Sequence, residues 1–400
     1  MKQLFKIGFD LSLASLSPIA SWFLLGVILD ANLVNIFSLT YPLQFLWLLL
    51  KDIFAVGGNL LATKTRNSQL ADAGIIVGAL ISGVIFGILA LNIDGFIRFM
   101  NMDPQIYREF SLYIVLQLWI QLIVMMIIEK LYYADKNTLA NKYSTIFNSV
   151  NFVCLIGSSL LTKNKWVIVG FTLMMILSAA LVIVRRELRF SKIKFNVLSA
   201  ARLNSMDILE NSVLFFVYLL GIGQAFSFGA EYALAITFAT LVTDIQWDVS
   251  TAIQTKAKID IAKNRMNFKT SFRDAYVLIA VLVATSVVGF VVMKNFYQLN
   301  LVLAVIYTGI EYIAYCFYPQ YRLKMDFLQL KYSAVKTTAV KFSAMIFRLI
   351  LVVILSPITP FALAVGQLSA QLYQVFWINL IFHRNYKILK NGKATKKVRK

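Results

Sequence analysis

The sequence predicts an all-α integral membrane protein with about twelve transmembrane helices in two six-helix bundles. The composition is the first observation, because 59% of the residues are hydrophobic and only 14% are charged, whereas soluble domains carry roughly 25% charged residues. Second, apolar stretches of about 20 residues, long enough to cross a bilayer, recur along the whole chain. Third, the basic residues are distributed unevenly between these stretches, as the positive-inside rule describes.

Twelve apolar windows are expected to form the transmembrane helices. They begin near residues 8, 34, 72, 111, 140, 165, 205, 231, 275, 299, 333 and 360. One alternate set of connecting loops is rich in Lys and Arg, including the run from Arg185 to Arg202. The opposite set is poor in them and holds Arg98, Arg108, Lys163, Lys165 and Lys294. The positive-inside rule therefore predicts a multi-pass protein of the cell (plasma) membrane with both termini in the cytoplasm.

The twelve windows divide into two halves. We expect an N-terminal six-helix bundle over 1–190, a cytoplasmic linker over 191–204, a C-terminal six-helix bundle over 205–384 and a basic cytoplasmic tail over 385–400. The linker is basic and is predicted to form, in part, an amphipathic surface helix. The net charge of +20 is interpreted as charge that sets the topology and lies near anionic lipid. We therefore expect membrane lipid, and no nucleic acid, as a partner.

Charged side chains at membrane depth are costly and usually face the protein interior or a water-filled cavity. The candidates are Lys51, Asp52, Glu129, Lys130, Asp207, Glu210, Asp244, Asp248, Glu311, Lys341 and Arg348. Among them, Glu210, Asp244 and Glu311 lie deep and have no adjacent basic residue, which favours a functional role. Lys51 can snorkel or pair locally. Lys341 and Arg348 share one helix face, and could either neutralise acids of a neighbouring helix or contact substrate.

The tenth window places an acid between two phenols. Tyr307, Glu311 and Tyr315 recur every four residues and so share one helix face. A carboxylate beside hydroxyl oxygens suits Na⁺, and a buried glutamate can bind H⁺ instead. Aromatic residues at helical spacing are also typical of packing, but the acid between them favours a site.

No motif of a common enzyme class is present. The sequence has no G-x-x-x-x-G-K-[ST] loop, which argues against ATP hydrolysis by a P-loop. His383 is its only histidine, and Cys154 and Cys316 lie in apolar segments, so no metal site is indicated. We expect a protein that is not an enzyme and needs no cofactor apart from a coupling ion.

Four short stretches resemble the multidrug and toxic compound extrusion (MATE) family. MNMDPQIYREFSLY at 100–113 resembles the turn before the family's fourth span, and LYYADKN at 131–137 resembles the cytoplasmic end of that span. ILENSVLFF at 208–216 is similar to the seventh-span segment that carries a cation-binding glutamate. YTGIEYIA at 307–314 is similar to the tenth-span segment that carries a tyrosine and a second cation-site acid.

The resemblance implies a secondary active exporter with its two bundles arranged as a V. It implies a monomer that exports small, cationic or amphipathic molecules by antiport with Na⁺ or H⁺. Glu210, Tyr307 and Glu311 would bind the coupling cation. Asp52, Asp244, Trp247, Asp248 and Tyr315 would line the substrate cavity, where Trp247 could make a cation–π contact.

Two other functions are compatible with the sequence. The MATE family belongs to the same superfamily as the flippases of polysaccharides and lipid-linked oligosaccharides. A flippase moves a substrate that carries pyrophosphate, so Lys51, Lys341 and Arg348 would be its binding residues and the acids would be structural. A membrane scaffold without transport activity is the third alternative, although a scaffold gives no reason for deep acids.

Overall fold

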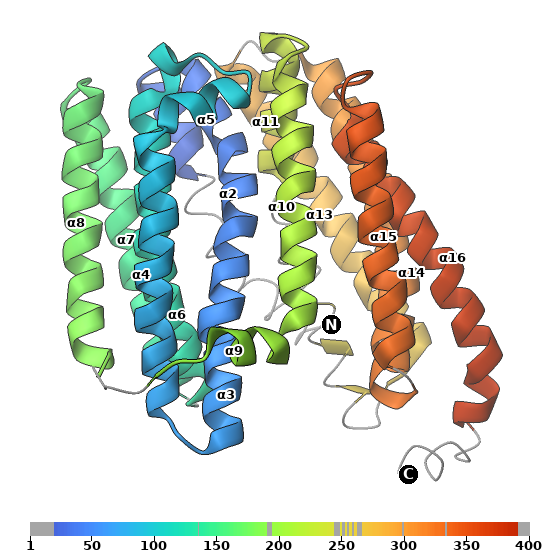
Figure 1. The fold of residues 1–400 in the computed structure, drawn as a ribbon. Helices are drawn as coiled ribbons and strands as arrows, with labels where there is room; N and C mark the ends of the chain where they lie inside the picture. The colour runs from blue at the N-terminus through green and yellow to red at the C-terminus, as the bar shows by residue number, and fades with distance from the viewer. Residues whose placement is uncertain are drawn as a thin grey trace. The chain divides into compact units, whose positions relative to one another are not determined.

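The computed structural model describes residues 20–134, 136–189, 194–243, 266–297, 300–332 and 334–390, together with residues 249, 253, 256, 257, 260 and 261. The described residues form helices and no β-strand (Figure 1). The chain forms two compact units. Among the described residues, the first ends at Ser227 and the second begins at Phe228. The predicted all-α fold is confirmed.

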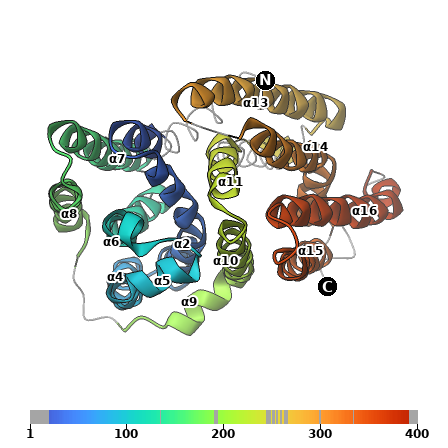
Figure 2. The same ribbon diagram turned by 90° about the horizontal axis from the view of Figure 1, so that it is seen from above.

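The N-terminal unit contains most of the chain before Ser227. After a helical segment at residues 20–28, its elements are η1 (Ala31–Asn35), α2 (Ile36–Lys51), η2 (Asp52–Val56), α3 (Gly57–Thr65), α4 (Gln69–Leu91), α5 (Ile93–Phe99), α6 (Pro104–Tyr133), α7 (Asn137–Leu161), α8 (Lys165–Glu187), α9 (Val197–Leu203) and α10 (Ser205–Phe226). Helix α6 packs against α2, α4, α7 and α8 and is therefore the centre of this unit (Figure 2).

The C-terminal unit is built around one helix. Its elements are α11 (Ala230–Thr243), α13 (Phe268–Phe296), α14 (Leu301–Lys331), α15 (Ala334–Leu355) and α16 (Ala362–Lys390). Helix α14 packs against all four of the others, most extensively against α16. Figure 2 shows α14, α15 and α16 side by side. One face of α14, which includes Glu311, is therefore buried.

Nine helices of the described chain are long and apolar enough to cross a membrane. They are the continuous segment from η1 to α3, then α4, α6, α7, α8, α10, α13, α14 and α15. The predicted windows near residues 231 and 360 correspond to α11 and α16. Most of the window near residue 8 lies outside the described residues. The chain is thus an all-α, multi-pass membrane protein.

Polar residues cap the N-termini of several helices. Asp103 precedes Pro104, the first residue of α6, and its Oδ1 accepts a hydrogen bond from the Gln105 backbone at 2.9 Å. Asn164 and Asn300 cap α8 and α14 in the same way. Such caps satisfy backbone donors that the first helical turn leaves without partners.

The boundary between the units differs from the sequence prediction, which placed residues 205–226 in the C-terminal bundle. Helix α10 packs along α2 of the N-terminal unit. The Tyr218 ring stacks on Tyr41 and Phe45, with centroids 5.5 and 4.9 Å apart. Near the C-terminal end of α10, Asn101 Nδ2 donates a hydrogen bond to the Gly223 carbonyl at 2.6 Å. Side-chain packing, which hydropathy does not report, therefore assigns α10 to the N-terminal unit.

The segment from η1 to α3 is irregular in its middle. Residues Asp52–Val56 form a single π-helical element, a feature that occurs frequently at functional sites. The following backbone lies very close to the linker helix α9, because a Cβ atom at Gly57 would lie 2.6 Å from the Ala200 carbonyl oxygen. On the neighbouring helix, a Cβ atom at Gly74 would lie 2.6 Å from the Phe54 carbonyl oxygen. Glycines thus allow the π-helical segment to pack against both α4 and α9.

Replacing Gly57 with alanine is expected to destabilise the protein. The added methyl group would overlap backbone atoms of α9, and overpacking of this kind costs about 1–3 kcal/mol. We expect Gly57→Ala to lower the thermal unfolding midpoint of the purified protein. The matched control is Gly87→Ala in α4, where an added Cβ has no neighbour within 4 Å. An unfolding midpoint that falls equally in both variants would contradict the close α3–α9 packing.

Candidate functional site

Glu311 of α14 is a buried acid inside a candidate membrane span. Only 4% of its surface is exposed, and its Oε2 atom has no hydrogen-bond partner among the described residues. The side-chain oxygen of Thr308, one turn earlier and also buried, likewise has none there. Buried polar atoms are nearly always hydrogen-bonded. These two therefore indicate a position where a ligand could bind.

Contacts between α14 and α16 show which residues lie at the level of Glu311. Near the start of α14, the Tyr307 and Phe361 rings have centroids 6.4 Å apart. Near its end, Lys324 Nζ lies 2.5 Å from Asn379 Oδ1. The two helices therefore run parallel with a nearly constant offset. That offset, 54 to 55 residues, places Glu311 opposite Val365 and Gly366, next to Gln367.

Arg348 reaches the same level from α15. Its Nη2 donates a hydrogen bond to Gln367 Oε1 at 3.1 Å, and 4% of its surface is exposed. The Arg348 charge acts electrostatically on Glu311, and the Thr243 hydroxyl of α11 also interacts with that carboxylate. Four helices thus contribute to one level, which we call the polar layer: Thr243, Glu311, Arg348 and Gln367.

Sequence patterns predict two residues of the polar layer, Glu311 and Arg348, but not Thr243 or Gln367. A signal existed for Gln367, because Gln367, Gln371 and Gln374 follow one another at spacings of four and three, which is one helix face, and all three are buried. Thr243 gave no signal, since a threonine in an apolar helix is common.

The two tyrosines flanking Glu311 are buried but differ in their surroundings. Tyr307, 1% exposed, lies near the Phe361 ring. Tyr315 stacks on Tyr318 with centroids 5.4 Å apart and belongs to an aromatic cluster that also includes Tyr312 and Tyr321. Each tyrosine lies one helical turn from Glu311, and the proposed site roles of both stay predictions.

Several predicted site residues cannot be placed in this layer. Asp244, Trp247 and Asp248 lie outside the described residues. Lys341 is partly buried on α15, seven residues or two turns before Arg348, and thus away from the level of Glu311.

In the N-terminal unit, Asp52 and Asn211 form a second polar contact. Asp52 is 7% exposed, and its Oδ2 accepts a hydrogen bond from Asn211 Nδ2 at 2.7 Å. Glu210, the residue before Asn211, is partly buried in α10. Asp52 is the first residue of the π-helical element, so this element turns the acid toward α10.

Lys51 has local partners, as one of the sequence interpretations expected. Its Nζ lies 3.9 Å from Glu129 Oε2 and 5.9 Å from the centroid of the Trp47 ring. These contacts lie within the N-terminal unit.

The structure does not bring Glu210 and Glu311 together within one unit. The predicted cation site combined Glu210 with Tyr307 and Glu311, on the expectation that residues 205–226 belong to the C-terminal bundle. Because α10 packs on α2, Glu210 belongs to the N-terminal unit and the other two belong to the C-terminal unit. The site that the structure describes around Glu311 is the polar layer.

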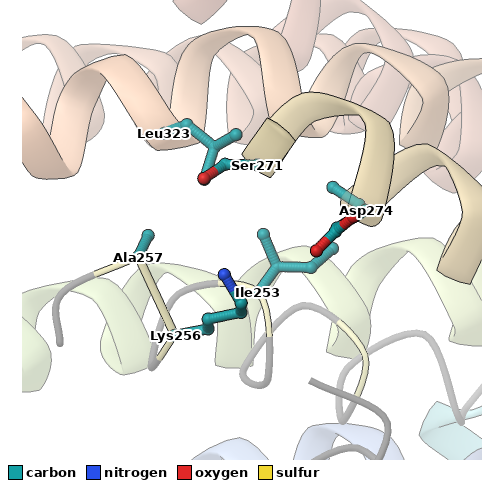
Figure 3. A pocket seen from close by; sticks show the side chains of 7 residues that line it. Ile253, Lys256, Ala257, Ser271, Asp274 and Leu323 are labelled. Atoms are coloured by element: carbon teal, nitrogen blue, oxygen red, sulfur yellow. The ribbon is translucent and has the colours of Figure 1, made fainter. Parts of the chain in front are cut away.

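A small pocket lies elsewhere in the C-terminal unit (Figure 3). It is lined by Ile253, Lys256, Ala257, Ser271, Asp274, Ala275 and Leu323. Leu323 follows Glu311 by twelve residues on α14, which is about 18 Å along a helix. Lys256 is paired with Asp260 at 2.8 Å, and Asp274 with Arg273 at 3.2 Å. No predicted site residue lines this pocket, and its charged residues have structural partners.

Comparison with known proteins identifies the fold. No protein-family model and no curated protein matches the sequence. Solved structures do match this fold. One is an inward-facing conformation of a multidrug resistance MATE family transporter of the MOP superfamily, with a TM-score of 0.71, 13% sequence identity, and coverage of 94% of this chain and 96% of that chain. An outward-facing conformation matches with a TM-score of 0.65, 14% identity and coverage of 98% and 96%.

A third match is a MOP superfamily transporter from Pyrococcus furiosus, with a TM-score of 0.62, 13% identity and coverage of 96% of each chain. That protein is described as having a binding pocket of reverse polarity, which suggests a different function for it. The fold and the membrane spans define an all-α, multi-pass membrane protein. More particularly, the chain has the fold of the MATE transporters over nearly its whole length, which confirms the predicted resemblance in the fold.

Replacing Asn211 with leucine is expected to destabilise the N-terminal unit. The change removes the amide that donates to the buried Asp52 carboxyl, and an unsatisfied buried polar group costs about 1–3 kcal/mol. We expect a lower thermal unfolding midpoint for Asn211→Leu and little further loss when Asp52→Asn is added. If the two substitutions lower the midpoint additively, the hydrogen bond does not couple them.

Proposed function

We propose that the chain is a MATE-like secondary active transporter that exports small, cationic or amphipathic molecules by antiport with Na⁺ or H⁺. The observation that carries the proposal is the buried Glu311 carboxyl, in a chain whose fold matches both inward-facing and outward-facing transporters. Antiport requires a cation and a substrate to favour different conformations of one protein. An acid in the membrane interior is suited to binding the cation.

In this proposal Glu311 is the principal cation ligand, with Tyr307 on the same helix face. Glu210 belongs to the other unit, so its role needs a separate test. Asp52, Asp244, Asp248, Tyr315 and Trp247 are carried forward as proposed cavity residues. Acids and an aromatic ring in a dry cavity would favour a cationic amphiphile. We also propose that the protein acts as a monomer in the cell membrane, with both termini in the cytoplasm.

Transport of a lipophilic cation tests this function. In energised everted vesicles, the wild-type protein is expected to accumulate ethidium only when a Na⁺ or H⁺ gradient is present. Glu311→Gln should reduce gradient-dependent accumulation to the background of vesicles without the protein, because the neutral amide cannot hold the coupling cation by charge. Glu210→Gln shows separately whether the acid of α10 is needed.

The matched control is Glu231→Gln. Glu231 is exposed at the start of α11 and accepts a hydrogen bond from Asn300 at 3.2 Å, so its neutralisation should leave accumulation intact. If intact wild-type protein accumulates no ethidium, or if Glu311→Gln retains full activity, the proposal is wrong. In that case, neutralising Lys51, Lys341 and Arg348 would test the flippase alternative.

A further inference from the structure

The polar layer contains a positive charge beside the acid proposed to bind a cation. Glu311 and Arg348 are each 4% exposed, and both lie in membrane-spanning helices. Isolated charges in such surroundings are costly, and an opposite charge nearby offsets much of the cost. The Arg348 charge acts on Glu311, so the two charges partly compensate each other.

The hydrogen bonds show that the guanidinium group is held by a third residue. Arg348 Nη2 donates to Gln367 Oε1 at 3.1 Å, whereas Glu311 Oε2 has no hydrogen-bond partner among the described residues. The aliphatic part of Arg348 packs close to α16, because a Cβ atom added at Gly366 would lie 3.6 Å from Arg348 Cγ. Gln367, which follows Gly366, therefore positions the guanidinium beside Glu311 and keeps one of its donors from that carboxylate.

We propose that Arg348 is a tethered counter-cation, which competes with the coupling cation for Glu311, and that Gln367 is the positioning residue that limits this competition. The inference rests on the proposed function of Glu311. When the site is empty, the guanidinium compensates the Glu311 charge. When Na⁺ or H⁺ is bound, the layer carries one excess positive charge, which favours release of the cation.

Other groups at this level do not provide the same compensation. The Thr243 hydroxyl and the Gln367 amide are neutral. Lys341 lies two turns away on α15, and the acid Asp326 lies fifteen residues beyond Glu311, where its Oδ1 is 3.3 Å from Arg322 Nε. Among the described residues of α11, α13, α14, α15 and α16, Arg348 is therefore the cation placed to act on Glu311.

Two substitutions are expected to change cation affinity in opposite directions. Arg348→Gln removes the competitor and should lower the half-maximal cation concentration about tenfold. Gln367→Leu removes one acceptor of the guanidinium, which favours its pairing with Glu311, and should raise that concentration several-fold. Arg348→Lys retains the charge and should remain near the wild-type value. A residue with a merely structural role would not give shifts of opposite sign.

The measurement is the thermal unfolding midpoint of the purified full-length protein as a function of cation concentration. NaCl is varied at constant pH with choline chloride holding the ionic strength, and a second series varies pH without Na⁺. Ligand that binds the folded state raises the midpoint, so the half-maximal concentration can be obtained without a transport substrate. The matched control is Gln374→Leu, which alters a buried glutamine two turns from Gln367 on the same helix and should not change the half-maximal concentration.

The outcomes separate this inference from the proposed function. If the wild-type protein responds to neither cation, or if Glu311→Gln responds like the wild type, the cation site itself is wrong and the inference falls with it. If the response depends on Glu311 but Arg348→Gln leaves its half-maximal concentration unchanged or raises it, only the inference is overturned. Should Arg348→Gln fail to fold, Gln367→Leu decides, because an unchanged or lower concentration in that variant also overturns the inference.

Discussion

The membrane interior gives a polar side chain no water to bind, so each charged group there must find its partner within the protein. The structure meets this constraint repeatedly. In the N-terminal unit Lys130 Nζ lies 2.5 Å from Asp72 Oδ1 and also donates to the Glu187 carbonyl at 2.7 Å. Asp52 is bonded to an amide of α10. In the C-terminal unit the guanidinium of Arg348 is bonded to a glutamine of α16. The helices are thus held together by polar contacts at positions where apolar packing alone would leave a charge without a partner.

Against this background, an incompletely bonded acid is informative. Glu311 is buried inside a candidate membrane span, and its Oε2 atom has no hydrogen-bond partner among the described residues, as is also true of Glu109 Oε2 near the start of α6. An acid that served only to join helices would gain by binding with both oxygens. The unbonded oxygen, on a helix enclosed by four others, therefore favours a function that requires the carboxyl to exchange partners. The same reasoning separates Glu311 from Glu129, which pairs with Lys51 in the N-terminal unit.

The membrane fold could be predicted from sequence because span length and loop charge follow directly from bilayer thickness and the cost of burying charge. Glu311 could be predicted for the same reason, since an acid within an apolar window stands out. The residues that contact Glu311 and Arg348 could not be predicted. Gln367 is distant in sequence, and its role depends on the offset between α14 and α16, which side-chain packing sets. The contacts of α10 could not be predicted for a related reason. Hydropathy places residues 205–226 in the membrane, but only the stacking of Tyr218 on Tyr41 and Phe45 shows which helices they join.

A site that must bind and release a cation in every cycle cannot hold it too firmly, because binding has to be favourable enough for the ion to enter and weak enough for it to leave. A lone buried carboxylate would fail the second condition, since releasing its cation exposes the full cost of an uncompensated charge in a medium of low dielectric constant. A guanidinium near the carboxylate reduces that cost. Direct pairing of the two groups would fail the first condition, because the cation would have to break an ion pair. Holding the guanidinium on a neutral glutamine lies between these extremes. In the proposed site, Glu311 would thus supply one charge for affinity, and Arg348, held on Gln367, would supply a second charge for release.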